Sequence, residues 1–432
     1  MDASALSPRG YLRVLALSAL LGIPAAAAAV VYTSVLHGVE TGLWHDLPKA
    51  LGWSQPPWWM VIALPTLAGV LVAAALRLPG HGGHPPLDEL SVDPVPIRAL
   101  PGILGASLAS LALGPVVGPE VPLVAIGLAL GLQAGRFARE GLTEVRLLGF
   151  AGAFAALSTA FGGPLPSALL LFEVAAASGM FASPALGRLL APGFLAAGVG
   201  SLLFTGVAGW PGVHEFHLGL PELPAYPSVR IPDLAWCALV AIVVGAAAVL
   251  CRSAATALAR RGVSRNPMWV LAGAGALIGL VAVIFRLVAD RPVDLVLFSG
   301  ASALAPTIAE GSAGVLVAIV LARALAFTMT IGAGFRGGMI FPAIAIGVGI
   351  AVLASHVLPG LAVTPAVVAA VAAAAAATLR APFFGALMSA LLAGAAGPET
   401  APIAIIAAVL GWLVAVAAQR QSPDGMPLGT AH

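Results

Sequence analysis

Apolar residues along the chain fall into a series of runs, separated by short segments rich in Gly, Pro and charged residues. Several runs have the length of about 20 residues that a helix needs to cross a bilayer. Others are shorter and are interrupted by Gly or Pro, which is typical of helices that end inside a membrane. We expect helices near residues 14–36, 58–76, 99–113, 121–138, 147–161, 164–178, 189–207, 234–251, 268–289, 311–331, 339–357, 361–378, 383–396 and 400–418.

Basic residues at the ends of the runs indicate the orientation. The first run follows Arg9 and Arg13 and exceeds the core of a signal peptide, so we expect a first transmembrane helix that starts in the cytoplasm. After Gln419 only a short tail is left, so we expect a cytoplasmic C-terminus and no C-terminal regulatory domain. The strongest marker of a further cytoplasmic segment is a cluster of arginines: Arg252, Arg260, Arg261 and Arg265.

The two halves of the chain repeat a pattern. The first reads GPEVPLVAIG and then FGGPLPSALLLFEV, and the second reads GGMIFPAIAIG and then LRAPFFGALMSALL. Pro122 precedes Pro164 by nearly the same interval as Pro342 precedes Pro382, and proline is well suited to the first turn of a helix. Chance pairing is the alternative in a chain with 51 Gly and 35 Pro. The pattern predicts a duplicated transporter-type fold, with its site where the halves meet.

Composition agrees with a membrane protein. The chain is 60% hydrophobic and 9% charged, whereas soluble domains contain about 25% charged residues. The net charge of +2 gives no sign of a nucleic-acid partner. We expect a single transmembrane domain over residues 1–432, with repeat one over about 58–208 and repeat two over about 268–418.

Two of the expected helix starts, GPEVP and GGMIFP, are candidate anion sites. A helix that begins inside the membrane leaves about four backbone N–H groups unpaired and carries the positive end of the helix dipole, so it can bind an anion without a basic side chain. Gly118, Gly337 and Gly338 let the backbone approach an ion closely.

Glu120 lies at the first of these starts, among glycines, prolines and aliphatic residues. A charged side chain at the bilayer centre costs roughly 2.5–3.5 kcal/mol, so an acid there is expected to have a function or a partner. Its carboxylate can occupy the place of an anion and loses that attraction when it is protonated. Glu120 is therefore a candidate gate or proton carrier, and the alternative is an ordinary N-cap acid at a membrane surface.

Other polar residues in apolar runs give weaker indications. We expect Glu173 to face a buried polar partner or the cytoplasmic end of its helix, with ion or proton handling as the alternative. For Arg323 we expect a structural bond to carbonyl groups or an acid rather than ion binding. Arg336 raises the local positive potential next to GGMIFP. His81 and His84 have no third ligand nearby, so we expect neither a metal nor a cofactor.

These stretches resemble the CLC family of chloride channels and proton-coupled chloride antiporters, whose hallmarks are G-S-G-x-P, G-x-E-G-P and G-G-x-F-x-P. GPEVP is similar to the second, with Glu120 at the gating position, and GGMIFP to the third, with Ile340 at the usual phenylalanine position. The resemblance implies an all-α polytopic membrane protein with inverted repeats and broken, re-entrant helices. It also implies a homodimer with one pathway per subunit, and an anion bound by backbone near Gly82, Gly83, Met339 and Ile340.

The departures from the family pattern concern side chains. Gly82 stands in the place of the anion-contacting serine, Val121 replaces a glycine, and no tyrosine follows Tyr226 to supply the family's tyrosine contact. Glu173 aligns with a structural acid of the antiporters, and Val174 stands where their inner proton-transfer glutamate would be. The last difference argues against the usual inner proton route.

The function that we expect is transmembrane transport of a small monovalent anion, with chloride as the first choice, through a pathway gated by Glu120 and with little or no proton coupling. The alternatives are a proton/anion antiporter for chloride or fluoride, and a non-CLC secondary transporter. The chain contains no HExxH or GxSxG motif, so we do not expect an enzyme. The expected location is the plasma (inner) membrane of a prokaryote. The expected partners are lipid and the anion and, in the antiporter alternative, coupled protons.

Overall fold

Helices account for every regular element in the part of the chain that the computed structural model describes, which is residues 7–88, 93–177, 186–207, 220–221, 223–262 and 266–420. The helices are α1 (Pro8–Thr41), α2 (Leu47–Ala50), α3 (Trp58–Ala75), α4 (Leu100–Ala112), α5 (Glu120–Phe137), α6 (Leu142–Ser158), α7 (Pro164–Ala177), α8 (Leu186–Val207), α9 (Ile231–Gly262), α10 (Pro267–Ala289), α11 (Leu304–Ile308), α12 (Ala313–Ala333), α13 (Ile340–Val357), α14 (Val363–Leu379), α15 (Pro382–Leu392) and α16 (Thr400–Arg420).

Each apolar run of the sequence lies on one of these helices, so the pattern of hydrophobic residues predicts the order of the elements. The main difference in length is at α9, which continues to Gly262 although its apolar run ends at Cys251. Ala and Arg dominate the added turns, and these residues favour a helix without being uniformly apolar. Arg265, the last arginine of the predicted cytoplasmic cluster, lies outside the described residues.

The protein is an all-α integral membrane protein. Among the described residues, eight helical stretches are long and apolar enough to cross a membrane. Other apolar helices, such as α4, α14 and α15, have 17 residues or fewer, as expected for helices that do not cross on their own. The spanning candidates are Pro8–Ala50, Trp58–Ala75, Glu120–Phe137, Ile231–Arg261, Pro267–Ala289, Ala313–Ala333, Ile340–Val357 and Thr400–Arg420.

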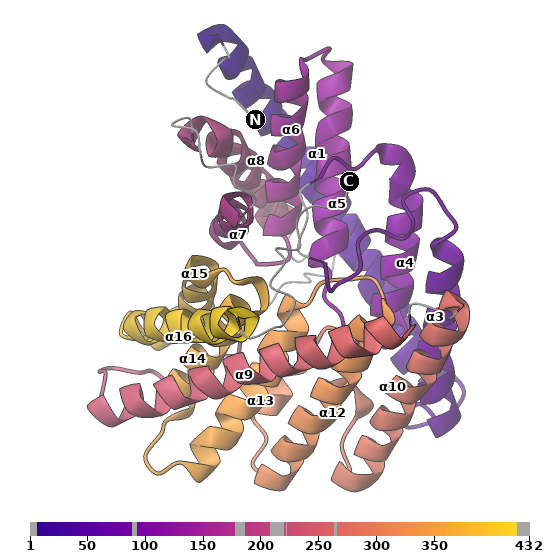
Figure 1. Cartoon of the computed structure of the whole chain (residues 1–432), viewed down its shortest axis with the longest axis vertical. Coiled ribbons are helices and arrows are strands. Elements are labelled where there is room, and N and C mark those ends of the chain that lie inside the picture. The colour runs from indigo at the N-terminus through magenta and orange to yellow at the C-terminus, as the bar shows by residue number, and fades with distance from the viewer. Residues whose placement is uncertain are drawn as a thin grey trace.

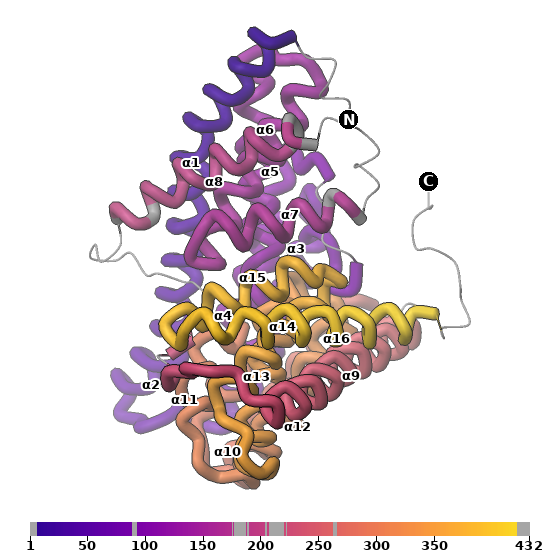
Figure 2. Tube along the Cα trace, turned by 90° about the vertical axis from the view of Figure 1, so that its left-hand side faces the viewer, coloured from indigo at the N-terminus to yellow at the C-terminus, as the bar shows by residue number. Residues whose placement is uncertain are grey.

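The helices gather into two groups, which Figure 1 shows one above the other. Helices α1 and α5–α8 form one group, and α9, α10 and α12–α16 form the other. The two groups are also separated in the perpendicular view of Figure 2. The repeat boundaries predicted from the sequence stay a prediction.

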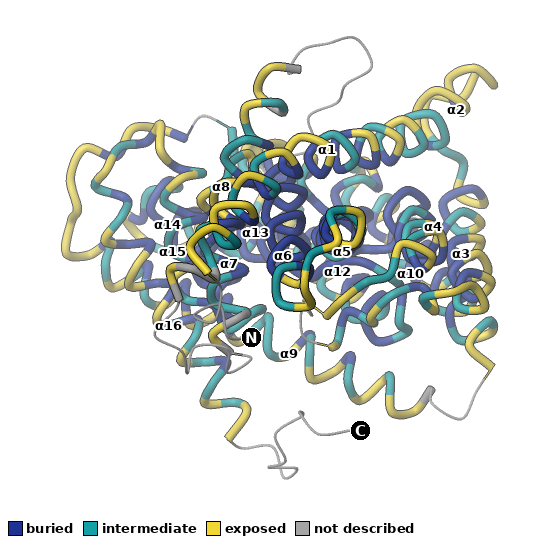
Figure 3. Tube along the Cα trace, turned by 90° about the horizontal axis from the view of Figure 1, so that it is seen from above, coloured by how far each residue is buried: buried dark blue, intermediate teal, exposed yellow. Residues whose placement is uncertain are grey.

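Small residues allow helices to approach closely. On α5, Gly127 lies so near the Gly152 carbonyl of α6 that a Cβ atom at either position would collide with the other helix. Gly69 of α3 lies in the same way against the Leu271 carbonyl of α10. Such backbone contacts are a main source of helix association in membranes, where lipid is as apolar as the side chains. Figure 3 shows long buried stretches along α6 and α13, and most residues of α14 are buried as well.

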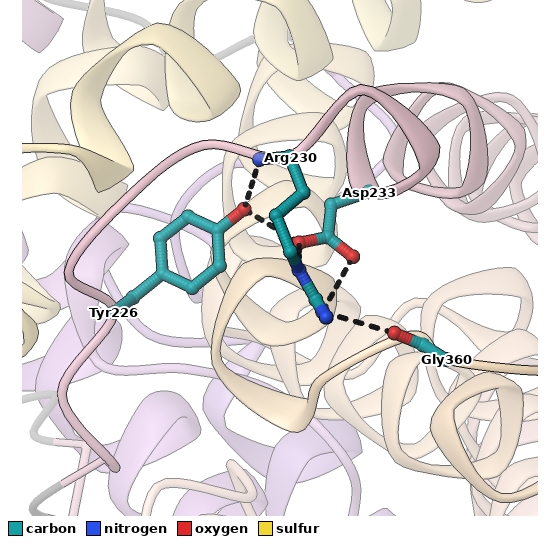
Figure 4. Close-up of polar contacts among 4 residues, drawn as sticks. All are labelled: Tyr226, Arg230, Asp233 and Gly360. Carbon is teal, nitrogen blue, oxygen red and sulfur yellow. Dashed lines mark hydrogen bonds and ion pairs between the residues drawn. The ribbon is translucent and has the colours of Figure 1, made fainter.

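Tyr226, Arg230 and Asp233 attach the N-terminal end of α9 to the loop after α13 (Figure 4). The fully buried Asp233 accepts hydrogen bonds from the Tyr226 hydroxyl at 2.7 Å and from Arg230 Nε at 2.8 Å. Arg230 Nη2 also donates to the Gly360 carbonyl at 3.0 Å. The hydrogen bond to Asp233 raises the pKa of Arg230 above its ordinary value. Tyr226, the last tyrosine of the chain, is therefore a structural residue at the start of α9.

Candidate functional site

The N-termini of helices α5 and α13 lie next to each other. Gly118 N donates to the Gly338 carbonyl at 2.8 Å, and Gly338 N donates to the Gly118 carbonyl at 2.6 Å, which makes an isolated antiparallel bridge. Helix α5 begins at Glu120 and α13 at Ile340, immediately after this bridge. The predicted pair of helix starts at GPEVP and GGMIFP is thus confirmed, and the two starts adjoin.

The Glu120 carboxylate lies on the N-terminus of the other helix. Its Oε1 atom accepts hydrogen bonds from Ile340 N at 3.0 Å and from Phe341 N at 3.1 Å. The side chain is 1% exposed, and its Oε2 atom has no hydrogen-bond partner among the described residues. A buried carboxylate therefore occupies the position at which the first N–H groups of α13 could bind an anion.

This arrangement has a direct chemical meaning. The N–H groups and the dipole of α13 favour a negative charge at this point, whichever molecule carries it. The carboxylate and a free anion compete for the same donors, and protonation removes the charge that makes Glu120 a competitor. The geometry can therefore bind an anion and can be gated by the side chain of Glu120.

Gly118 and Gly338 leave the room that the carboxylate uses. A Cβ atom added to Gly338 would overlap Glu120 Oε2, and a Cβ atom on Gly118 would meet the same oxygen. Neither glycine has a left-handed backbone conformation. Side-chain volume, and not backbone strain, is therefore the reason why these positions need glycine.

An alanine at position 338 is expected to displace the Glu120 carboxylate from α13. The backbone tolerates alanine there, and the atom in the way is the end of a flexible side chain. We expect Gly338→Ala to raise anion flux at pH 7 several-fold and to flatten the dependence of flux on pH, both measured in proteoliposomes. The matched control is Gly105→Ala, because a Cβ atom on Gly105 would meet no other atom within 4 Å. An unchanged pH profile in Gly338→Ala would contradict the steric argument.

A cavity of about 290 Å³ opens beside the carboxylate. Glu120, Met339 and Ile340 line it from the two helix starts, and Val121 lines it from the next position of α5. The loop between α3 and α4 also lines the cavity, with Gly83 and the polar residues His84, Asp88 and Asp93. Four of the residues predicted to form the site, Glu120, Gly83, Met339 and Ile340, thus lie around one cavity.

Gly82, the remaining residue of the predicted anion site, has different neighbours. Gly82 and Gly83 both have positive φ angles, 70° and 79°, which glycine adopts without strain. The Cα atom of Gly82 faces Leu76, Ala106 and the Arg336 guanidinium. The loop therefore presents Gly83 to the cavity and turns Gly82 toward the protein interior.

Arg336 contributes positive charge behind this loop. Its Nη2 atom donates to the His81 carbonyl at 3.4 Å, and its backbone N–H donates to Ser110 Oγ at 2.9 Å. The guanidinium Nε and Nη1 atoms are buried and have no hydrogen-bond partner among the described residues. This position agrees with the expectation that Arg336 makes the electrostatic potential next to GGMIFP more positive.

Glu173, the second acid in apolar context, also caps a helix of the other group. Its Oε1 accepts from Phe383 N at 3.0 Å and its Oε2 from Phe384 N at 2.7 Å, at the first turn of α15. The expected polar partner of Glu173 is thus the backbone of α15. This contact connects α7 to α15 and satisfies N–H groups that would otherwise be unpaired.

Phe161 contacts both of the carboxylate-capped helices, α13 and α15, which no motif of the sequence predicts. Its ring stacks on Phe341 at 6.0 Å between centroids and is tilted against Phe384 at 5.2 Å. The backbone N–H groups of these two phenylalanines donate to Glu120 and Glu173. One aromatic residue therefore contacts the first turns of both capped helices, which are far apart from it in the sequence.

Arg323 donates hydrogen bonds to carbonyl groups, which is one of the two kinds of partner that we expected, and its structural role stays a prediction. It is 1% exposed on α12, and its guanidinium donates to the carbonyls of Leu295 at 2.9 Å, Asp294 at 3.2 Å and Leu297 at 3.3 Å. These carbonyls belong to the turn that follows α10. Arg323 does not lie at the start of α13. Among the described residues, no group of three His, Cys, Asp or Glu side chains could hold a metal ion.

Comparisons with known proteins point to one family. The family model described as "Voltage gated chloride channel" matches residues 80–416. A relative from Escherichia fergusonii, described as "Putative ion-transport protein YfeO", is 31% identical over 351 residues, which cover 79% of this chain and 78% of the relative. The YfeO protein of Salmonella schwarzengrund is 33% identical over 352 residues, with 78% of this chain and 79% of the relative covered.

Solved structures share the fold at low sequence identity. A slow cyanobacterial Cl⁻/H⁺ antiporter superposes with a TM-score of 0.77 at 18% identity, covering 96% of this chain and 95% of that one. A CLC-type fluoride/proton antiporter superposes with a TM-score of 0.71 at 16% identity, covering 95% and 97% of the two chains. At these identities the likeness concerns the path of the backbone.

Proposed function

Because the chain belongs to the voltage-gated chloride channel (CLC) family, we propose that it carries a small monovalent anion, chloride first, through a pathway in each subunit that Glu120 gates. The observation that carries the proposal is the Glu120 carboxylate on the N–H groups of Ile340 and Phe341. The carboxylate acts there as an internal anion that accepts hydrogen bonds from backbone N–H groups. A chloride ion needs the same donors, so it can bind there only when the Glu120 carboxylate moves away.

Proton-coupled exchange of chloride or fluoride is the second candidate. It is supported by the cavity beside Glu120, whose lining includes His84, Asp88 and Asp93 as groups that can take up a proton. Val174, in the position of an inner proton-transfer glutamate, disfavours it. We therefore propose flux with little or no proton coupling, and the experiment below distinguishes the two.

The remaining parts of the proposal rest on the family alone. We propose a homodimer in the inner membrane of a prokaryote, with both termini in the cytoplasm, that acts as a transporter and not as an enzyme. Size-exclusion chromatography with light scattering tests the dimer. Labelling of single cysteines introduced near each terminus of intact cells tests the orientation.

Flux from proteoliposomes with a panel of anions tests the function. We expect saturable chloride flux that follows the chloride gradient. The flux should increase on acidification, because protonation of Glu120 releases the N–H groups at the start of α13 for the ion. Chloride-driven uphill proton movement would establish antiport instead, and preferential fluoride flux would change the substrate. If folded, monodisperse protein carries none of the anions, the proposed function is wrong.

A further inference from the structure

The start of α1 and the turn between α5 and α6 lie together at one end of the molecule, as Figures 1 and 2 both show. Arg13 of α1 joins them: its Nε atom pairs with Glu140 Oε1 at 2.8 Å, and its Nη2 atom donates to the Ala138 carbonyl at 3.0 Å. We call the arginines of residues 8–13 and 136–146 the arginine patch: Arg9, Arg13, Arg136, Arg139 and Arg146.

The patch has more positive charge than its own acids neutralise. Residues 8–13 and 136–146 contain five arginines and two glutamates, and one of these, Glu140, is already paired with Arg13. Arg9, Arg136 and Arg139 are exposed, and no acid in the described part of the chain pairs with them. Arg9 lies one turn before Arg13 on the same face of α1. The patch therefore attracts anionic groups.

Arg139 has a backbone conformation that glycine adopts more easily. Its φ angle is 57°, in the left-handed region, directly after Ala138, the C-cap residue of α5. The Glu140 N–H group donates to the Gly135 carbonyl at 3.0 Å, which closes the helix in a way that usually places glycine at this position. A side chain is strained there. Such strain is typical of positions at which the side chain has a function.

Large apolar side chains beside the arginines face outward. Leu12, which precedes Arg13, is 64% exposed, and Phe137, which follows Arg136, is 78% exposed. Leu142, at the start of α6, is 85% exposed. The boundary between lipid headgroups and acyl chains accommodates both apolar side chains and guanidinium groups. The combination fits a phospholipid, whose phosphate interacts with arginine and whose chains contact the apolar residues.

We propose that the arginine patch binds the headgroup of an anionic phospholipid, in the leaflet on the side of the N-terminus. A free phosphate ion has a similar charge but would leave Leu12, Phe137 and Leu142 in water, so these residues favour the lipid. The bound lipid contacts both α1 and the C-terminal end of α5, the helix that starts at Glu120. The proposal goes beyond anion transport and does not depend on it, because lipid binding is measured without flux.

Native mass spectrometry of detergent-solubilised protein, titrated with phosphatidylglycerol or phosphatidylcholine, tests the proposal. We expect the wild type to bind the anionic lipid more tightly, and Arg136→Gln and Arg139→Gly each to weaken this binding about fivefold. Arg139→Gly should melt at or above the wild-type temperature, because glycine fits the left-handed conformation. Arg139→Lys keeps the charge and should lose less binding than the glycine variant. Lys49→Gln, which removes an exposed positive charge beyond the opposite end of α1, is the matched control and should bind as the wild type does.

Three outcomes would overturn the proposal. If a well-folded double variant, Arg136→Gln with Arg139→Gly, binds phosphatidylglycerol as tightly as the wild type, the patch does not bind lipid. If phosphatidylcholine binds as tightly as phosphatidylglycerol, the charge of the patch has no role. If inorganic phosphate at millimolar concentration displaces phosphatidylglycerol, the patch is a site for free anions. A wild type that binds the anionic lipid selectively but carries no chloride would refute the proposed function and would support this inference.

Discussion

Replacing Glu120 with glutamine is expected to raise chloride flux at pH 7 by about tenfold or more and to abolish the increase of flux on acidification. Glutamine keeps the size of the side chain but has no charge, so it competes poorly for the N–H groups of Ile340 and Phe341. A hydrogen bond to a charged group contributes about 1.5–3 kcal/mol, and 1.4 kcal/mol corresponds to a factor of ten. The measurement is initial flux from proteoliposomes between pH 4.5 and 7.5.

Glu144→Gln is the matched control for this change. Glu144 is also an acid in the first turn of a helix, α6, but it does not line the Glu120 cavity. We expect its pH profile to follow the wild type. If Glu120→Gln retains the wild-type pH profile, another group titrates and Glu120 is not the gate.

Replacing Arg323 with methionine is expected to give the largest loss of stability of any variant considered. The guanidinium is buried and donates to three carbonyl groups. Methionine fills a similar space but leaves these carbonyls without their donor, and an unsatisfied buried group costs about 1–3 kcal/mol. We expect a total loss on the order of 3 kcal/mol or more and a fall in apparent Tm on the order of 5 °C in detergent.

The control for the loss of a long basic side chain is Arg77→Met, because Arg77 is exposed just after the end of α3. We expect its apparent Tm to stay within about 1 °C of the wild type, since exposed substitutions usually change stability by less than 0.5 kcal/mol. If Arg323→Met melts with the wild type but changes anion selectivity, Arg323 takes part in ion binding, and our structural assignment is wrong.

The amino-acid sequence by itself determined the helices and the chemistry at their ends. Apolar periodicity placed each predicted run on a helix, and GPEVP and GGMIFP identified the starts of α5 and α13. The same local context singled out Glu120 and predicted that Arg323 bonds to carbonyl groups. These features depend on residues within a few positions of one another, because a helical turn, a cap and a run of apolar side chains are all short-range properties.

Only the tertiary structure decided which groups meet. It placed Glu120 on α13 and Glu173 on α15, packed Phe161 against both of these helices, and turned Gly83 rather than Gly82 to the cavity. It also brought Arg13 to the turn between α5 and α6. These pairings join residues far apart in the chain, and their geometry depends on how closely whole helices approach. That approach is set by packing at positions such as Gly127 and Gly152, which a local pattern of residues cannot specify.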